Sequence, residues 1–266
     1  MLPYGYGIIN TKGVSPVPEF SPGRSMLRSR FPETRESLTD QRKGLPQPPL
    51  EKPLPVGSIV IDLPDPALAC PPQTDLFSLL RDRQSRREYS PERLTLEELS
   101  FLLWATQGVK SIVRDGFATL RTVPSGGSRH PFETYLAVNR VEGLEPGIYR
   151  YMAIGHKLTH LTSPTDLPSR IEAACGGQGF VGSAAVVFFW SSTPYRCEWR
   201  YSVAAHKTVA QDSGHVCQNL YIACEALGLA TVAIGAYDQT KADALLELDG
   251  EDELVTYVAP VGKRRG

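Results

Sequence analysis

The spacing of apolar residues along this chain predicts its helices and strands. Between residues 95 and 107, leucines recur every three or four positions, as on one face of a helix. Thr95 and Glu98 occupy the two positions of a capping box at its start, and Gly108 follows as a stop signal. The same periodicity predicts further helices, over residues 166–175, 203–227 (where Gly214 could introduce a bend) and 240–248.

Strands are predicted where apolar and polar residues alternate, or where a short apolar run stands between turn signals. They are residues 57–62, 133–139, 147–152, 157–161, 184–190, 230–235 and 254–261. The run from Ala184 to Trp190 is apolar throughout, as in a strand that is covered on both faces. Strands and helices in this order predict an α+β fold, a mixed sheet with helices packed on it.

Proline divides the chain into two parts. Fourteen of the 22 prolines lie in residues 1–72, a segment with no sustained helix or strand period. These residues are predicted to form an irregular arm that is disordered, wraps the body, or wraps a partner subunit. Residues 73–266 are predicted to form the globular domain.

Composition excludes several functions. The net charge is -1, which predicts no binding to nucleic acid or to an anionic membrane. No apolar run is long enough to span a bilayer, and the N-terminus lacks a signal-peptide pattern, so a cytoplasmic location is the default. The five cysteines form no C-x-x-C pair and the five histidines have no metal-ligand spacing, so no metal site is predicted. Cys217 and Cys224 are predicted to be buried free thiols.

The densest chemical signal is the stretch Arg83-Gln84-Ser85-Arg86-Arg87. Arginine presents a planar fork of donors that binds phosphate through two hydrogen bonds, and a serine between such forks adds a hydroxyl donor. The stretch is predicted to clamp an anion, with a solvated surface run as the alternative.

Three other segments carry weaker signals. In residues 124–127, Pro-Ser-Gly-Gly, the glycines would let the backbone approach a flat ligand, and a long turn is the alternative. The C-terminal cations at 263–265 are a second phosphate anchor or a solvated tail. Residues 177–182 match G-x-G-x-x-G, but a helix precedes them and a strand follows, the reverse of a dinucleotide site. A helix C-cap and loop is the predicted use of these glycines.

Taken together, these motifs resemble the nitroreductase-like flavoproteins, and within them the SagB-type dehydrogenase branch that is associated with azole formation in modified peptides. The resemblance covers residues 79–262 and also rests on His130-Pro131-Phe132-Glu133, Pro146-Gly147-Ile148-Tyr149, Gly214-His215 and Ile234-Gly235-Ala236-Tyr237-Asp238. It implies a mainly antiparallel sheet and an intertwined homodimer with FMN at the interface.

The resemblance also implies roles for individual residues. It assigns FMN contacts to Arg83, Gln84, Ser85, Arg87, Pro124, Ser125, Gly126, Gly127, Ile234, Gly235, Lys263 and Arg265. The loop at 124–127 would come from the other subunit, and Arg86 is expected to point to solvent. A Lys-Tyr pair that serves in azoline oxidation corresponds here to Arg200-Tyr201. Arg200 cannot act as a general base, because arginine stays protonated, but it could bind an anionic substrate or orient Tyr201.

Three functions therefore remain open. The first is an FMN-dependent oxidoreductase that transfers hydride to or from a small organic molecule or a peptide heterocycle. The second is an NAD(P)H-dependent nitroreductase or quinone reductase. The third is a non-catalytic protein that binds or stores FMN under its N-terminal arm.

Overall fold

The computed structural model describes residues 21–36, 38–69 and 75–265. The expected absence of a signal sequence concerns residues outside these ranges, as do the first part of the arm and Cys70. None of the helices in these ranges combines the length and the apolar character that crossing a bilayer requires.

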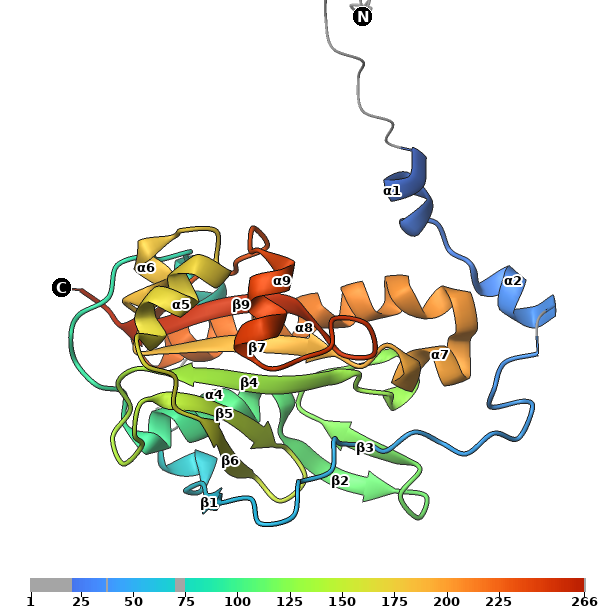
Figure 1. Cartoon of the computed structure of the whole chain (residues 1–266), viewed down its shortest axis with the longest axis horizontal. Coiled ribbons are helices and arrows are strands. Elements are labelled where there is room, and N and C mark those ends of the chain that lie inside the picture. Colours follow the sequence, from blue (N-terminus) through green and yellow to red (C-terminus); the bar gives the residue numbers. More distant parts are fainter. Residues whose placement is uncertain (1–20, 37, 70–74, 266) are drawn as a thin grey trace, which may run out of the picture.

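A seven-stranded sheet forms the centre of the molecule (Figure 1), with the strand order β1-β6-β5-β4-β7-β9-β8. Its strands are β1 (Val60–Asp62), β4 (Phe132–Val138), β5 (Gly147–Met152), β6 (Lys157–Thr162), β7 (Val186–Ser192), β8 (Leu229–Thr231) and β9 (Leu254–Lys263). All neighbouring strands in this order pair antiparallel. The α+β prediction is confirmed, and the sheet is antiparallel throughout rather than mixed.

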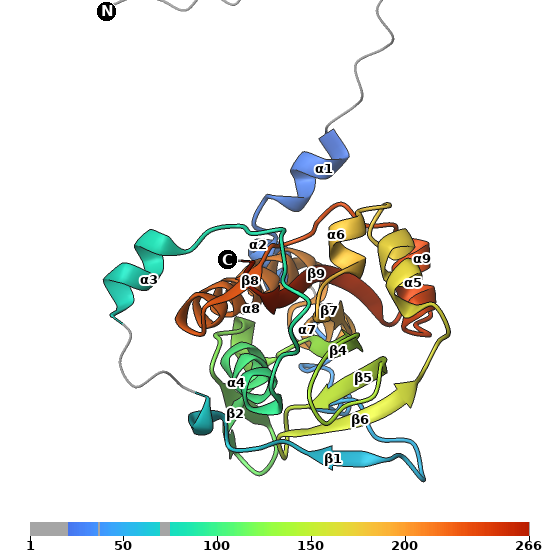
Figure 2. The same cartoon turned by 90° about the vertical axis from the view of Figure 1, so that its left-hand side faces the viewer.

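Helices cover both faces of the sheet (Figure 2). On one face lie α4 (Leu96–Gln107) and α8 (Ala205–Ala226), and on the other lie α5 (Leu167–Ala174), α6 (Gly179–Gly182) and α9 (Gln239–Leu245). Each layer of helices has its own cluster of buried apolar side chains against the sheet. The sheet thus lies between two apolar cores, each covered by helices.

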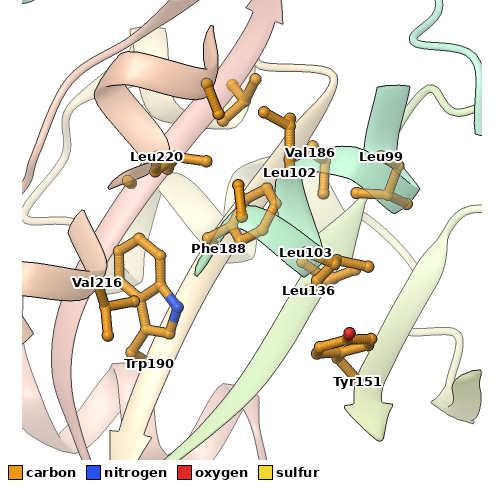
Figure 3. Packing of buried hydrophobic residues seen from close by; sticks show 14 of the residues in the cluster. Leu99, Leu102, Leu103, Leu136, Tyr151, Val186, Phe188, Trp190, Val216 and Leu220 are labelled. Atoms are coloured by element: carbon orange, nitrogen blue, oxygen red, sulfur yellow. The ribbon is translucent and has the colours of Figure 1, made fainter. Parts of the chain in front are cut away.

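Strand β7 contributes to both cores. Phe188 and Trp190 pack with residues of α4 and α8 (Figure 3), whereas Val187 and Phe189 belong to the cluster of the opposite face. All four side chains are fully buried. Successive side chains of a strand point to opposite faces, so an apolar run is buried throughout only if both faces are covered. This confirms the prediction made from the run Ala184 to Trp190.

The predicted capping box begins α4. The Thr95 hydroxyl accepts a hydrogen bond from the Glu98 N–H at 3.2 Å, and the Glu98 carboxylate accepts one from the Thr95 N–H at 2.9 Å. The helix ends at Gly108, whose N–H donates to the Trp104 carbonyl at 2.8 Å. A Cβ at Gly108 would overlap the Trp104 ring, so glycine is required there.

The helix predicted over residues 203–227 differs from the observed one. Helix α7 (Tyr195–Tyr201) precedes a 3-10 turn over Ser202–Ala204, and α8 then runs through Gly214 without interruption. The break comes at Ser202, whose φ of +46° lies outside the helical region. The positive φ of the single residue Ser202, rather than the glycine, therefore sets the angle between α7 and α8.

Several short elements were not predicted, because each is too short to display a period. They are α1 (Ser21–Met26), α2 (Phe31–Glu36), α3 (Leu76–Asp82), the hairpin of β2 (Val109–Val113) and β3 (Ala118–Arg121), and the 3-10 turns Pro66–Leu68 and Gly126–Ser128. Part of the G-x-G-x-x-G sequence forms α6, where a Cβ on Gly182 would lie 2.5 Å from the Pro168 carbonyl oxygen. Gly176, with a φ of +68°, follows the end of α5.

Helix α1 projects away from the body (Figure 1), whereas the arm from about residue 38 onward runs along the body of the same chain. The Gln41 N–H donates to the Trp199 carbonyl, the Lys52 N–H donates to Glu133 at 2.8 Å, and β1 adds a strand beside β6. Of the three alternatives for the arm, these residues follow the one in which it wraps the body.

Candidate functional site

The arginine-rich stretch follows α3 and meets two other segments at Tyr221 of α8. The guanidinium carbon of Arg83 lies 5.0 Å from the centre of the Tyr221 ring, and the Ser85 and Tyr221 hydroxyls are 2.9 Å apart. The Tyr221 hydroxyl also accepts a hydrogen bond from the Ala233 N–H at 2.8 Å. Tyr221 therefore joins the stretch to the segment that precedes Ile234, a role that no sequence motif indicated.

Further along the stretch, cations gather in one pocket. A pocket of about 310 Å³ is lined by Arg86, Arg87, Glu88, Arg264 and Arg265. An antiparallel β-bridge between the backbones of Tyr89 and Arg264 holds the C-terminal residues beside the stretch. Glu225 pairs with Arg86 and Arg264, whereas Arg87 and Arg265 have no acidic partner among the described residues, so the pocket is suited to an anion. The structure thus brings two of the predicted phosphate ligands, Arg87 and Arg265, to one place.

The prediction that Arg86 points to solvent is wrong. Its guanidinium donates to Glu225 of α8 at 2.9 Å, and Arg264 contacts the same carboxylate oxygen at 2.7 Å. Glu225 is only 10% exposed, so it draws both arginines onto the protein. The arginine that most suggested a plain charge run is thereby a structural one.

The other residues predicted to contact FMN near the arginine-rich stretch differ in their surroundings. The Lys263 ammonium donates to Glu98 at the start of α4, so this cation is already paired. Gln84 is exposed. Ile234 is buried and its N–H donates to the Val258 carbonyl at 2.8 Å, which fixes the backbone that leads to Gly235. No atom lies within 4 Å of a Cβ built on Gly235, so packing within this chain does not explain the glycine.

The Pro124–Gly127 loop is anchored to the opposite end of α8. The Gly126 N–H donates to the Asp212 carboxylate at 3.0 Å, and the Ser125 hydroxyl accepts from the His130 N–H at 2.9 Å. Burial raises the pKa of Asp212, although hydrogen bonds from Ser125 and Gly126 act in the opposite direction. Asp212 was missed from the sequence, because a lone aspartate in a helix carries no signal. Pro124, at the head of the loop, is exposed.

The two glycines of the loop make room for side chains of the same chain. A Cβ on Gly126 would overlap the Thr208 side chain, and one on Gly127 would overlap the Tyr201 hydroxyl and lie 3.0 Å from Arg200 Nε. Gly127 also has a φ of +59°, which glycine adopts without strain. The structure therefore places Arg200 and Tyr201, predicted from a separate motif, directly beside the loop.

Helix α2 of the arm covers this end of the molecule. The rings of Phe31 and Tyr201 meet edge to face, with their centres 5.5 Å apart. Lys207 donates to the Leu27 carbonyl at 2.6 Å, which holds the segment before α2 against α8. Tyr201 is thus enclosed between the arm and the loop.

Within one chain, the two groups of predicted residues lie apart. The stretch meets α8 at Tyr221 and Glu225, and Arg264 of the C-terminus meets Glu225 as well, whereas the loop that lies against Arg200 and Tyr201 meets α8 at Asp212. Nine residues separate Asp212 from Tyr221 on α8, or about 13 Å along the helix axis.

His130 follows the loop and gives a prediction about acid stability. It is 4% exposed, and burial, assisted by the charge of Arg121, lowers its pKa to about 3. The folded state therefore binds this proton less readily than the unfolded state, whose histidine has its ordinary pKa of about 6.5. We expect the free energy of unfolding to fall as pH decreases from about 6.5 towards 3, by up to about 1.4 kcal/mol per pH unit from this residue.

A His130→Gln variant tests this expectation by urea unfolding at several pH values. Glutamine retains an N–H that can replace the contact of His130 Nε2 with the Thr119 carbonyl, at 3.1 Å. The difference in unfolding free energy between wild type and variant should shrink as the pH falls. His160→Gln, at a half-buried position of β6, is the control. If the difference in unfolding free energy between wild type and variant stayed the same from pH 6.5 to 3, His130 would not be the source of the acid sensitivity.

Comparison with known proteins gives a family match over most of the chain. The family model described as "Nitroreductase family" matches residues 80–263. The protein named "Putative nitroreductase MJ1384" from Methanocaldococcus jannaschii is 32% identical over 189 residues, which cover 71% of this chain and 91% of that protein.

Two further similarities are more distant. The trifolitoxin-processing protein TfxB of Rhizobium leguminosarum bv. trifolii is 28% identical over 166 residues, covering 60% of this chain and 44% of TfxB. The crystal structure of a Ralstonia eutropha JMP134 protein that bears the same description as MJ1384 superposes with a TM-score of 0.62 at 28% identity, covering 84% of this chain and all of that one.

Proposed function

Because this chain belongs to the nitroreductase family of oxidoreductases, we propose that it is an FMN-dependent oxidoreductase that binds FMN between two copies of itself. The observation that carries the proposal is the meeting of Arg83 and Ser85 with the segment before Ile234 at Tyr221. FMN has a dianionic phosphate at one end and a flat ring at the other. Cations suit the first, and an open stretch of backbone suits the second.

The residues present fit such a cofactor. Arg83, Ser85 and Arg87, with Gln84 through its backbone or amide, would hold the polar parts of FMN. Arg265 would add a cation from the C-terminus. Lys263 stays a prediction of the resemblance, since its ammonium is paired with Glu98.

The backbone beside this group supports the fit to the ring. The open space beside Gly235 would admit the flavin ring next to Ile234. When bound, the flavin supplies hydride transfer at its N5 atom, while the protein sets orientation and electrostatics.

Separation of the two residue groups along α8 supports a homodimer. In a dimer, the Pro124–Gly127 loop of one subunit would meet the arginine stretch of the other. The exposed apolar face of α3 fits an interface, since Leu76 is 64% exposed, Phe77 69% and Leu80 54%. Beside this face lies a mostly apolar hollow of about 560 Å³ between α3, α4 and α8. Exposed apolar surface of this kind marks interaction sites.

The substrate we propose is a small organic molecule or a peptide heterocycle, as in the SagB-type branch. The similarity to TfxB, a protein named for processing trifolitoxin, supports a peptide substrate. Tyr201, next to the loop, would then contact the substrate, and Arg200 would bind or orient it rather than take a proton. The similarity to MJ1384 favours a second candidate, an NAD(P)H-dependent nitroreductase or quinone reductase.

One experiment tests the core of this proposal. Purified protein, incubated with FMN and freed of excess cofactor, should be yellow, and light scattering coupled to gel filtration should give a dimer. Denaturation should release about one FMN per chain. Protein that stays colourless would contradict cofactor binding, and a monomer that retains FMN would contradict the shared site. Anaerobic reduction with NADH, NADPH and organic donors then separates the candidate functions. Slow reduction by all of them would favour a storage protein.

A further inference from the structure

Arg129 and Arg200 lie beside the Pro124–Gly127 loop, and no acidic side chain in the described part of the chain pairs with either of them. Arg129 is 3% exposed, and its guanidinium donates to the Gly127 carbonyl at 3.1 Å and to the Phe117 carbonyl at 2.7 Å. It stacks on the Phe117 ring at 4.6 Å. Its position is therefore fixed by the protein itself.

Arg200 is held close to it by the same ring. The Arg200 guanidinium carbon lies 5.9 Å from the centre of the Phe117 ring and 5.6 Å from that of Tyr201. Across the ranges that the structure describes, no hydrogen-bond acceptor and no acidic side chain pairs with the Arg200 guanidinium. Stacking orients its planar fork and leaves the N–H donors available.

Holding two like charges together is unfavourable. Burial lowers the pKa of Arg129, and the charge of Arg200 lowers it further. A cationic pair that is buried at one member and lacks an anionic partner is stabilised when an anion binds. The pair lies at the loop proposed to contact the flavin, so an anion bound there would belong to the reacting molecule.

We propose that Arg200, supported by Arg129, binds a carboxylate of the substrate and so selects acidic organic or peptide substrates over neutral ones. The proposal rests on the proposed function, since it requires the loop to lie against the flavin. Two donors of Arg129 are already used by backbone carbonyls, so the guanidinium of Arg200 is the one that is open to a ligand. A single open fork matches the two oxygens of a carboxylate.

A purely structural role is the competing explanation. Arg200 lies in the last turn of α7, where a cation interacts favourably with the helix dipole, and its stacking could serve packing alone. Under that explanation, replacing Arg200 would alter stability but would not discriminate between acidic and neutral substrates. The pair 4-nitrobenzoate and 4-nitrobenzamide separates the two cases, because the molecules share shape and nitro group and differ in charge.

The test compares Arg200→Gln and Arg200→Lys with Arg170→Gln, an exposed arginine of α5, as the matched control. In the FMN-loaded dimer, Arg200→Gln should raise the KM for 4-nitrobenzoate by about 10- to 150-fold and leave that for 4-nitrobenzamide within about twofold. Arg200→Lys should recover only part of the loss, because lysine lacks the fork. Arg170→Gln should change neither KM.

Calorimetry with benzoate gives a readout that needs no turnover. Wild type should bind benzoate, and Arg200→Gln should bind it at least about tenfold more weakly. Protein that does not take up FMN but binds benzoate through Arg200 would contradict the proposed function and would still support a carboxylate site at Arg200. If Arg200→Gln changed the KM values of both nitro compounds equally, or changed neither, the carboxylate site would be overturned. A rise confined to the KM for NADPH would assign Arg200 to the cofactor phosphate instead and would also overturn it.

Discussion

Glu133→Gln is expected to lower the free energy of unfolding by about 3–5 kcal/mol, although it changes a single atom. The Glu133 carboxylate accepts a hydrogen bond from Arg196 at 2.5 Å, and the two side chains are 3% and 5% exposed. The same oxygen accepts the Lys52 N–H of the arm. Glutamine keeps an acceptor but removes the charge, so Arg196 remains buried without a counterion, which is the costly case for a buried pair.

Urea unfolding at pH 7 measures this loss. Glu92→Gln is the matched control, because Glu92 is exposed and a surface change of this kind is worth less than about 0.5 kcal/mol. A loss below about 1 kcal/mol for Glu133→Gln would mean that water or another acid compensates Arg196. That outcome would contradict the view of Glu133 as the anchor of both α7 and the arm.

The consequence extends to the site, because Arg196 lies one turn before Arg200 and Tyr201 on α7. The Glu133–Arg196 pair ties this helix to the first residues of β4, and the Lys52 contact ties the arm to the same point. In the variant, the arm residues near Lys52 should become cleavable by protease at lower urea concentrations than the sheet. Loss of both regions in one transition would instead show that the anchor serves the whole fold.

The sequence was most informative where a feature is local. The capping box at Thr95 and the doubly covered strand at β7 needed only residues within a short window, and both are found as predicted. Hydrophobic periodicity also located most strands of the sheet. Motif order then indicated the family, which the match over residues 80–263 bears out.

Features that depend on distant partners could not be predicted. Glu133 and Arg196 are 63 residues apart in the sequence, and Arg86 and Glu225 are 139 apart, so nothing local indicated that either pair would form. The Gly127 position was interpreted as space for a ligand, but its own chain also fills that space with Tyr201. A glycine in the sequence indicates that some group packs closely against the backbone, but it does not show whether that group is a ligand or a side chain of the same chain.

Arg83→Ala is expected to weaken FMN binding by about 10- to 150-fold, the range of one charge-assisted hydrogen bond. Arg83 stacks on Tyr221 beside Ser85, and no acidic partner among the described residues neutralises it. Its donors are therefore oriented and unpaired, and they lie closer to a ring than those of Arg87, whose guanidinium carbon is 6.0 Å from the centre of the Phe180 ring. Arg86 differs, since Glu225 already pairs with it.

Arg81→Ala gives a closely matched control. Arg81 lies two residues earlier, over the Phe77 ring at 5.7 Å, but its guanidinium is paired with Asp82 and is more than half exposed. Flavin fluorescence titration of the two variants compares arginines that share a ring contact and differ in their surroundings. Equal weakening would mean that general positive charge attracts FMN, whereas a loss confined to Arg83→Ala would mean that geometry at Tyr221 does. Unchanged affinity in Arg83→Ala would remove this arginine from the binding site and leave Arg87 and Arg265 to hold the phosphate.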